Sequence, residues 1–231
     1  EFLQIRGQAP DSAATNLRPQ QLFDADPQDL AALAGSFRPT MPMFQRYLVV
    51  GGFPEIALHE DVTFCQRLLR EDVVERVLKR DMTALFGVRN VTDLENLFTY
   101  LCLHSGGILA VKTCADALGT STTTVNNYLQ FLQQANLIYR LAPWALGGKK
   151  VLKARQKVYL ADAALRNAVL LRGEDILENP EEMGKVIETT VLRHLFAYYY
   201  PDTPEIRYWR DASTGREVDI IVSSPRYVIP V

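Results

Sequence analysis

The sequence predicts an α+β fold that is mainly helical, and three observations lead to this class. Apolar residues recur at helical spacing over most of the chain up to about residue 137, and again over residues 180–200. Short runs rich in β-branched and aromatic residues occur only at 137–160 and 205–231. Glycine and proline separate these runs, so strands gather in the second half of the chain instead of alternating regularly with helices.

Composition narrows the class of protein. The chain has 231 residues, of which 48% are hydrophobic and 23% charged, as in globular proteins. A net charge of −2 argues against a general polyanion binder, although local basic patches can still act. The three cysteines show no CxxC spacing, and no run has the length of a membrane span or the pattern of a secretion signal. We therefore expect a cytoplasmic protein that does not bind membranes.

Residues 1–90 are predicted to form a helical, lid-like or linker region. Asp26 and Pro27 suit the N-cap and first position of a short helix. Gly51 and Gly52 follow an apolar helical turn and are expected to end it. The stretch Thr63–Met82 alternates apolar and charged residues at the spacing of an amphipathic helix.

Residues 91–165 are predicted to form a winged helix-turn-helix domain. Three helical stretches, 93–107, 110–119 and 120–138, are followed by two strand-like runs, 137–142 and 157–161, around a loop with proline and glycine. In the third helix Val125, Leu129 and Leu132 share one face, which we expect to be buried.

Residues 166–231 carry the acidic residues of interest. Asn179-Pro180 begins a helix that ends at Tyr200-Pro201, and it contains Glu188 on its packed side. The strands 205–211 and 216–222 form a predicted hairpin, and 227–231 begins a third strand. Asp219 lies in the second of these strands, with Glu217 on the same face. A buried carboxylate needs a partner, which the sequence offers as a cation, a metal ion or the nearby arginines of the hairpin.

A helix glutamate followed by an aspartate on a hairpin strand resembles the PD-(D/E)xK, or restriction-endonuclease-like, core. The resemblance implies that Glu188 and Asp219 are metal ligands and catalytic residues for Mg²⁺, an ion that prefers oxygen ligands. The acid-x-Lys of that motif would fall just after Val231, so we expect a truncated nuclease-like module with an incomplete catalytic set.

The order of motifs along the whole chain is similar to that of prokaryotic AAA-type ATPases with a C-terminal domain of unknown function. The motifs are YLVVGGFPEI, VLKRDM, TVNNYLQFLQQANLIYRL, KVYLADAAL and YWRD followed by GREVDIIV. The resemblance implies a parent protein that binds ATP and magnesium through a preceding P-loop core. Because this sequence contains no GxxxxGK[ST], we expect no cofactor and no ATP hydrolysis in the chain itself.

A possible nucleic-acid surface lies in the winged-helix segment. Between Leu137 and Leu160 the charged residues are all basic: Arg140, Lys149, Lys150, Lys153, Arg155 and Lys157. The last three alternate along a predicted strand, and such a basic stripe suits phosphate contacts. The third helix could offer Thr122, Thr123, Asn126 and Asn127 to bases, yet it contains no lysine or arginine.

Three hypotheses follow for the function. The first is a regulatory and binding region of an ATPase, whose winged helix contacts DNA or a protein partner such as its own ATPase core. The second is a magnesium-dependent nuclease module that is inactive as truncated. The third is a protein-docking adaptor, because a winged helix can serve either purpose. The three histidines have no Cys or carboxylate at ligand spacing, so a zinc site is not expected.

Overall fold

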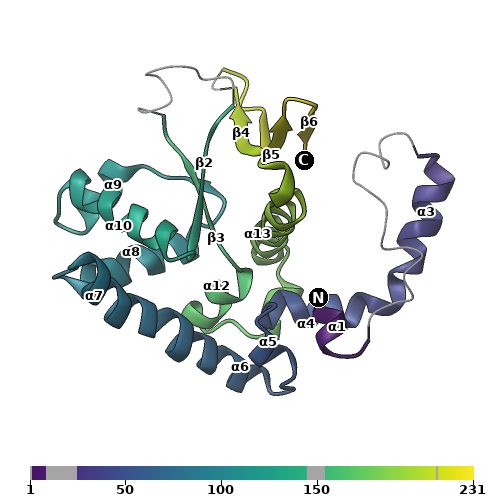
Figure 1. The fold of residues 1–231 in the computed structure, drawn as a ribbon, viewed down its shortest axis with the longest axis horizontal. Coiled ribbons are helices and arrows are strands. Elements are labelled where there is room, and N and C mark those ends of the chain that lie inside the picture. Colours follow the sequence, from purple (N-terminus) through teal and green to yellow (C-terminus); the bar gives the residue numbers. More distant parts are fainter. Residues whose placement is uncertain (1, 9–24, 145–153, 212) are drawn as a thin grey trace.

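The computed structural model describes residues 2–8, 25–144, 154–211 and 213–231 (Figure 1). It is a mainly helical α+β structure, as the sequence predicts, and its described strands form one mixed sheet.

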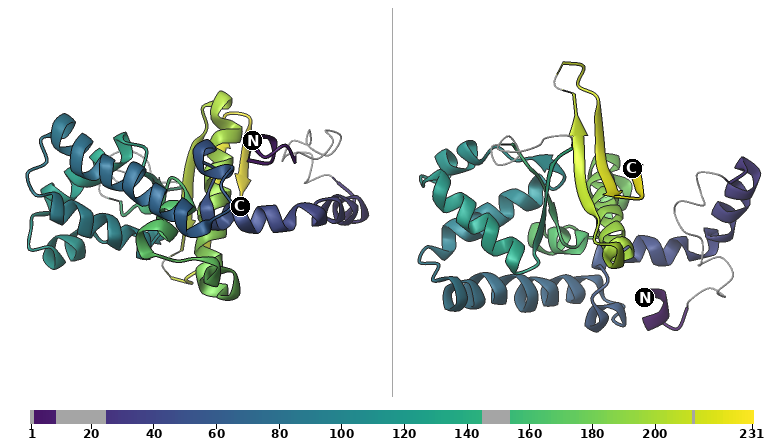
Figure 2. Two further views of the ribbon diagram at one scale, coloured as in Figure 1. Left: turned by 90° about the horizontal axis from the view of Figure 1, so that it is seen from below. Right: turned by 45° about the horizontal axis from the view of Figure 1, so that its top comes forward.

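The N-terminal helices are short. They are α1 (Phe2–Ile5), α3 (Pro27–Ser36), η2 (Arg38–Thr40), α4 (Met41–Val50) and α5 (Pro54–Ala57). As predicted, Asp26 caps α3, where its side chain accepts a hydrogen bond from the Gln28 backbone N–H. Both views of Figure 2 show α3 reaching away from the rest of the chain, and α3 has no buried residue.

The predicted amphipathic helix over 63–82 is part of a longer helical segment. This segment consists of α6 (Val62–Leu68), η3 (Leu69–Asp81) and α7 (Met82–Phe86). The 13 residues of η3 have the wider turn of a π-helix. The buried residues Leu69, Val74, Leu78 and Met82 are spaced by five, four and four positions, which the wider turn brings onto one face.

The middle of the chain contains α8 (Val91–Leu103), β1 (Gly107–Ile108), α9 (Val111–Ala117), α10 (Thr122–Gln134), β2 (Ile138–Pro143) and β3 (Lys157–Leu160). The three predicted helices and the two longer strands are confirmed, and Val125, Leu129 and Leu132 are buried as expected. Strand β1 was not predicted because two residues are too few to show an alternating pattern. This element order is compatible with a winged helix, which stays a prediction.

The C-terminal part consists of α12 (Ala163–Leu170), η4 (Glu174–Glu178), α13 (Pro180–Tyr199), η5 (Tyr200–Asp202), β4 (Glu205–Arg210), β5 (Glu217–Ser224) and β6 (Tyr227–Pro230). The predicted long helix and the strands of the hairpin are therefore confirmed. Asn179 caps α13 by accepting hydrogen bonds from the backbone N–H groups of Glu181 and Glu182.

The described strands form one sheet in the order β1-β3-β2-β4-β5-β6. The pairing of β2 with β4 is parallel, at Ala142↔Arg207 and Pro143↔Tyr208, and the other neighbours are antiparallel. This short parallel contact joins the strands of the predicted winged helix to the predicted nuclease-like hairpin.

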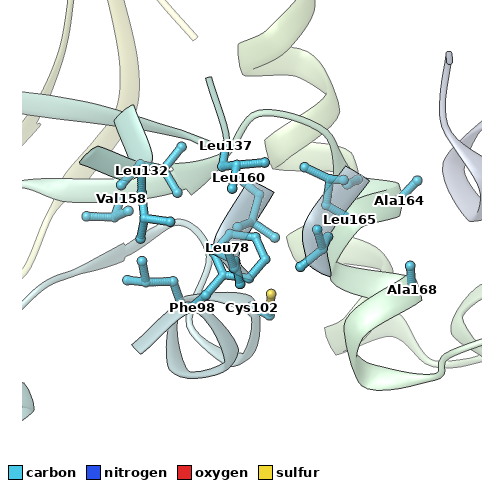
Figure 3. Close-up of a cluster of buried hydrophobic side chains, with 14 of the residues drawn as sticks. Leu78, Phe98, Cys102, Leu132, Leu137, Val158, Leu160, Ala164, Leu165 and Ala168 are labelled. Carbon is cyan, nitrogen blue, oxygen red and sulfur yellow. The ribbon is translucent and has the colours of Figure 1, made fainter. Parts of the chain in front are cut away.

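The principal hydrophobic core also crosses the predicted domain boundaries. It runs from Tyr47 in α4 to Val186 in α13, and Figure 3 shows part of it, with Leu78, Phe98, Leu132 and Leu165. A second cluster packs α13 against the sheet and includes Leu141, Tyr159, Leu192, Tyr208 and Val222. The three predicted segments thus share buried surface.

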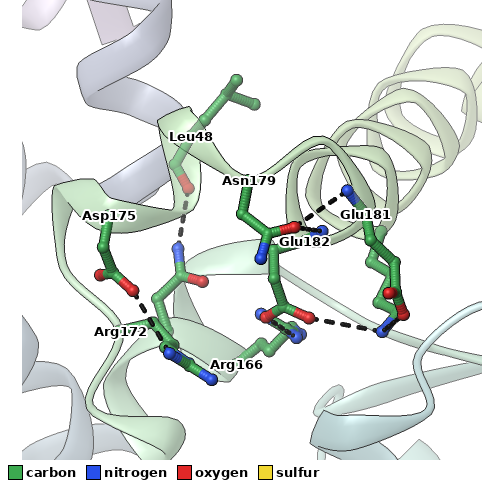
Figure 4. Close-up of polar contacts among 9 residues, drawn as sticks. Leu48, Arg166, Arg172, Asp175, Asn179, Glu181 and Glu182 are labelled. Atoms are coloured by element: carbon green, nitrogen blue, oxygen red, sulfur yellow. Dashed lines mark hydrogen bonds and ion pairs between the residues drawn. The ribbon is translucent and has the colours of Figure 1, made fainter.

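A polar network ties α12 to α4 and α13 (Figure 4). The Arg166 guanidinium is almost completely buried and donates to the carboxylate of Glu182. The Asn167 amide donates to the backbone carbonyls of Leu48 and Val49, at 2.9 and 3.1 Å. These bonds fix the end of α4, which leads directly into Gly51 and Gly52.

The sequence predicts no membrane span and no disulfide framework. In the described ranges, no helix combines the length and the apolar character needed to span a bilayer. Cys65, Cys102 and Cys114 are buried free thiols, and burial raises the pKa of Cys102 to about 12.

Candidate functional site

The ammonium group of Lys157 lies among three carboxylates. Its Nζ is 2.6 Å from Asp219 Oδ1, donates to Glu217 and is 3.9 Å from Glu188 Oε1. The lysine is only 3% exposed. The structure therefore brings the two predicted site residues, Glu188 and Asp219, to a single cation.

Three elements supply this carboxylate–lysine cluster, which consists of Lys157, Glu188, Glu217 and Asp219. Strand β5 carries Glu217 and Asp219 on one face because they are two positions apart, and α13 carries Glu188. Lys157 comes from β3, which is separated from β5 by β2 and β4. The lysine spans this distance over the ring of Tyr208 in β4, whose centroid is 5.8 Å from Nζ.

Tyr159 holds Glu188 from the other side. It points to the same face of β3 as Lys157, is completely buried, and its hydroxyl donates to Glu188 Oε1. Gly106 leaves space for this pair, since a Cβ there would lie 3.2 Å from both Glu188 oxygens and from the Tyr159 ring. Its φ of 83° is also one that glycine adopts easily.

The electrostatics of the cluster favour a charged lysine. Burial opposes the charge on Lys157, yet hydrogen bonds to Asp219 and Glu217 raise the pKa of the ammonium above its ordinary value. Burial raises the pKa of Glu188, and the Tyr159 hydroxyl and the Lys157 charge offset only part of this effect. Burial and the neighbouring carboxylates also raise the pKa of Tyr159, which therefore stays a donor.

Lys157 takes the position that the resemblance to a nuclease core gives to magnesium, and the magnesium site stays a prediction. Carboxylate oxygens are suitable magnesium ligands, but here an ammonium occupies the point where they meet. In the part of the chain that the structure describes, no group of three or more His, Cys, Asp or Glu side chains is placed to hold a metal ion. As described, the cluster is a set of ion pairs within the protein.

The sequence also offered hairpin arginines as partners for the acids. Arg210 lies 3.7 Å from Glu217, so one such contact is present, whereas Asp219 pairs with Lys157. Sequence reasoning missed the roles of Lys157, Tyr159 and Gly106. The alternation of Lys157 and Tyr159 was a usable signal, because it places a cation and a hydroxyl on one face of a strand.

The predicted nucleic-acid face of α10 is open to solvent. Thr122, Thr123, Asn126 and Asn127 are all exposed, on the side opposite Val125 and Leu129. The Asn126 amide donates to the Thr122 carbonyl of its own helix at 2.9 Å, so one of its donors is engaged.

The expected basic stripe needs a correction at Lys157. Its ammonium is buried against carboxylates and is not on the surface, because β3 turns it toward α13 and β5. Arg155 is exposed and precedes β3, and Arg140 is partly buried, with Nε donating to Gln156 Oε1 at 2.7 Å. Burial lowers the pKa of Arg140. Lys149, Lys150 and Lys153 lie outside the described residues.

Comparison with known proteins places these elements in a family. A family model named Domain of unknown function (DUF8612) matches residues 41–175, more than half of the chain. The chain belongs to the DUF8612 family. A second model, Domain of unknown function (DUF4143), matches residues 183–231 of this DUF8612 chain and covers Glu188, Glu217 and Asp219.

Relatives of this DUF8612 chain occur in bacteria and archaea. An uncharacterized protein of Mycobacterium tuberculosis is 28% identical over 155 residues, which are 66% of this chain and 34% of the relative. An uncharacterized protein of Methanocaldococcus jannaschii is 26% identical over 181 residues, which are 76% of this chain and 38% of the relative. An uncharacterized protein of Haemophilus influenzae is 22% identical over 129 residues, which are 54% of this chain and 32% of the relative. The chain thus matches about a third of the length of these relatives. No solved structure matches the chain.

Proposed function

We propose that this chain is a regulatory and binding region of a prokaryotic AAA-type ATPase and that it contacts DNA through α10. The observation that carries the DNA contact is the exposed polar face of α10, formed by Thr122, Thr123, Asn126 and Asn127. Amide and hydroxyl side chains of this kind can bond base edges or phosphates.

The basic residues that follow α10 in the sequence support DNA as the partner. Arg155 is exposed, and Lys149, Lys150 and Lys153 precede it in a segment without acidic residues. Basic side chains bind phosphates whatever the base sequence, so they would supply affinity while α10 supplies contacts to bases. A protein partner, including the ATPase core itself, is the competing outcome.

Duplex DNA binding, measured by fluorescence polarisation across a range of salt concentrations, tests the proposal. We expect affinity to fall as salt rises, and the slope to flatten when Lys149, Lys150, Lys153 and Arg155 are replaced by glutamine. Lys79→Gln, which removes an exposed lysine of the η3 segment, is the matched control. A DNA affinity that changes neither with salt nor in the fourfold variant would exclude a DNA interface here. If the chain instead co-purifies with a protein and has no affinity for DNA, it acts as a protein-docking adaptor.

The ATPase assignment is tested on the longer protein. DUF4143 is often found in C-terminal regions associated with AAA ATPases, and the chain matches about a third of the length of the Mycobacterium tuberculosis relative, which supports a further domain in the parent protein. We expect a parent protein with a P-loop to hydrolyse ATP with magnesium, and chain 1–231 not to hydrolyse it. ATP hydrolysis by the isolated chain would contradict this division.

A magnesium-dependent nuclease is the second candidate, and the convergence of Glu188 and Asp219 on one point favours it. Because Lys157 fills that point, we expect chain 1–231 not to cleave DNA. The form to test is a chain continued past Val231, with Glu188→Gln and Asp219→Asn as controls. A continued chain that still does not cleave DNA with magnesium would remove this candidate.

A further inference from the structure

A cavity separate from both α10 and the carboxylate–lysine cluster contains an oriented arginine. It has a volume of about 670 Å³ and lies between α1, the end of α4, β2 and the last turns of α13. Arg193 of α13 lines it, and 35% of that side chain is exposed. A partly exposed guanidinium in a cavity of this size is suited to an anionic ligand.

Buried partners fix the guanidinium in place. Its Nη1 donates to the Tyr47 hydroxyl at 2.5 Å, and its Nε lies 3.6 Å from Asp162 Oδ2. Asp162 is almost completely buried, receives the Ala164 backbone N–H and forms no hydrogen bond through Oδ2. Gly52 allows this approach, because a Cβ there would lie 3.2 Å from Arg193 Nη1 and 2.9 Å from the Tyr47 ring.

The cavity is free of negative side chains. Among the described residues that line it, the ionisable groups are Arg193, His194 and tyrosines, and no aspartate or glutamate is present. Asp162 lies behind Arg193 and does not line the cavity. An incoming anion would therefore meet the exposed side of the guanidinium, while the carboxylate of Asp162 lies on its other side.

Aromatic rings provide flat surfaces around the arginine. Tyr139 and Phe196 stack with centroids 4.3 Å apart and planes at 13°. Tyr198 and Tyr200 line the cavity and are 48% and 79% exposed, so their rings are accessible to a ligand. Rings of this kind stack on bases of any sequence, and removing one lowers affinity by roughly 5- to 150-fold per base.

We propose that this cavity binds a nucleotide unit, with Arg193 on a phosphate and Tyr198 or Tyr200 stacked on the base. A nucleotide fits both features of the cavity, because its phosphate can bind the arginine and its flat base can stack on the aromatic rings. The unit could come from a single-stranded nucleic acid or from a free nucleotide, which share this chemistry. Unlike the proposed α10 interface, the site does not require a duplex.

Fluorescence polarisation with a labelled ten-nucleotide oligothymidylate tests the proposal on chain 1–231. We expect Tyr198→Ser with Tyr200→Ser to weaken binding on the order of tenfold or more, since two stacking surfaces are removed. Arg193→Lys, which keeps the charge and loses the planar fork, is expected to weaken it as well. Arg172→Gln, which removes an exposed arginine paired with Asp175, is expected to leave binding unchanged.

The two sources of the nucleotide are separated by competition. Displacement by thymidine monophosphate at concentrations near those of the oligonucleotide indicates a free nucleotide, whereas displacement by longer strands alone indicates single-stranded DNA. Inorganic phosphate reports the contribution of Arg193 without a base. Because both tyrosines are exposed, their variant is expected to fold even if Arg193→Lys does not.

The proposal is overturned if neither the oligonucleotide nor the monophosphate binds, or if binding is unchanged in the tyrosine variant. Binding that is lost only when α10 is altered would also overturn it, and would leave the proposed duplex interface intact. If the tyrosine variant loses oligonucleotide binding but keeps duplex binding, the result supports this site independently of α10.

Discussion

Lys157 is buried because its charge is matched by the three carboxylates around it. An unpaired ammonium in this position would be strongly unfavourable, and the same holds for the carboxylates once the lysine is removed. The partners are not equally buried, since the side chains of Glu188, Glu217 and Asp219 are 30%, 26% and 52% exposed. Water therefore reduces part of the cost of separating them.

Lys157→Met is expected to lower the free energy of unfolding by about 1–3 kcal/mol, less than for a fully buried pair, because water reaches the carboxylates. Urea unfolding followed by circular dichroism measures the change. Lys112→Met, at an exposed position of α9, is the matched control and is expected to stay within about 0.5 kcal/mol of the parent. Equal stability of the two variants would show that the cluster does not stabilise the fold.

The pKa of Lys157 gives the same variant a pH signature. A lysine whose pKa is raised in the folded state contributes stability that is complete below its ordinary value of 10.5. That contribution is lost as pH rises through the folded pKa. The difference in unfolding free energy between parent and Lys157→Met should thus persist from neutral pH to about 10.5 and shrink above it. A difference that already disappears at pH 8 would contradict this assignment.

Glu182 provides the opposite case. Its hydrogen bond from the buried Arg166 lowers the pKa of its carboxyl below 4.5. Its contribution is therefore present above the ordinary value and is lost as pH falls through the lowered one. Glu182→Gln should cost about 1.5–3 kcal/mol at pH 7, the range for hydrogen bonds to charged groups, and progressively less below pH 4.5. Urea denaturation of the parent and of Glu182→Gln at several pH values measures the loss of unfolding free energy and its pH dependence. A loss that does not change with pH would rule out the ion pair as its source.

At the scale of elements, the end of α4 depends on glycine. Gly51 has φ 79°, and a Cβ there would lie 2.7 Å from the Ala164 Cβ and 2.8 Å from Asp162 Oδ1. Backbone strain and collision with α12 act together at this residue. At this turn α12 therefore leaves no room for a side chain at Gly51.

Gly51→Ala is expected to destabilise the protein by more than about 2 kcal/mol, the sum of left-handed strain and a backbone shift. Gly35→Ala is the matched control in α3, where φ is not positive and a Cβ meets nothing within 4 Å. That change should instead stabilise α3 by up to about 1 kcal/mol. Thermal unfolding of both variants checks the opposite signs, and a neutral Gly51→Ala would mean that the turn can relax.

Much of the element order could be predicted because the signals are local. Periodicity and caps located α10 and α13, and alternation located β5. The two-residue β1 could not be predicted because it is too short to show an alternating pattern, and the apolar spacing of η3 did not distinguish a π-helix from an α-helix. Long-range contacts could not be predicted either. Glu188 and Asp219 were suggested by a known motif, whereas the contact between Lys157 and Asp219 joins residues 62 positions apart in the sequence.

At the scale of the whole molecule, the shared core and the continuous sheet bind the three predicted segments together. Tyr47 and Val186 belong to one cluster, and β2 pairs with β4 across the boundary at about residue 165. Segments with separate cores would be free to unfold independently, but these segments share buried surface.

We therefore expect a single cooperative unfolding transition. The two tryptophans are Trp209 in β4 and Trp144, whose backbone N–H donates to the Tyr208 carbonyl, so tryptophan fluorescence reports the β2–β4 contact. Far-ultraviolet circular dichroism reports mainly the helices. The two signals should give the same urea midpoint. Separate midpoints would show that the hairpin is an independent unit despite the sheet.

The pairing register of β3 also sets the charge balance of the opposite half of the sheet. A slip of one residue would turn Lys157 to the other face, since side chains alternate along a strand. Glu188, Glu217 and Asp219 would then repel one another, with Arg210 left as a cation beside Glu217. A partner or ligand that shifts β3 relative to β2 would thus remove one positive charge from the carboxylates of α13 and β5.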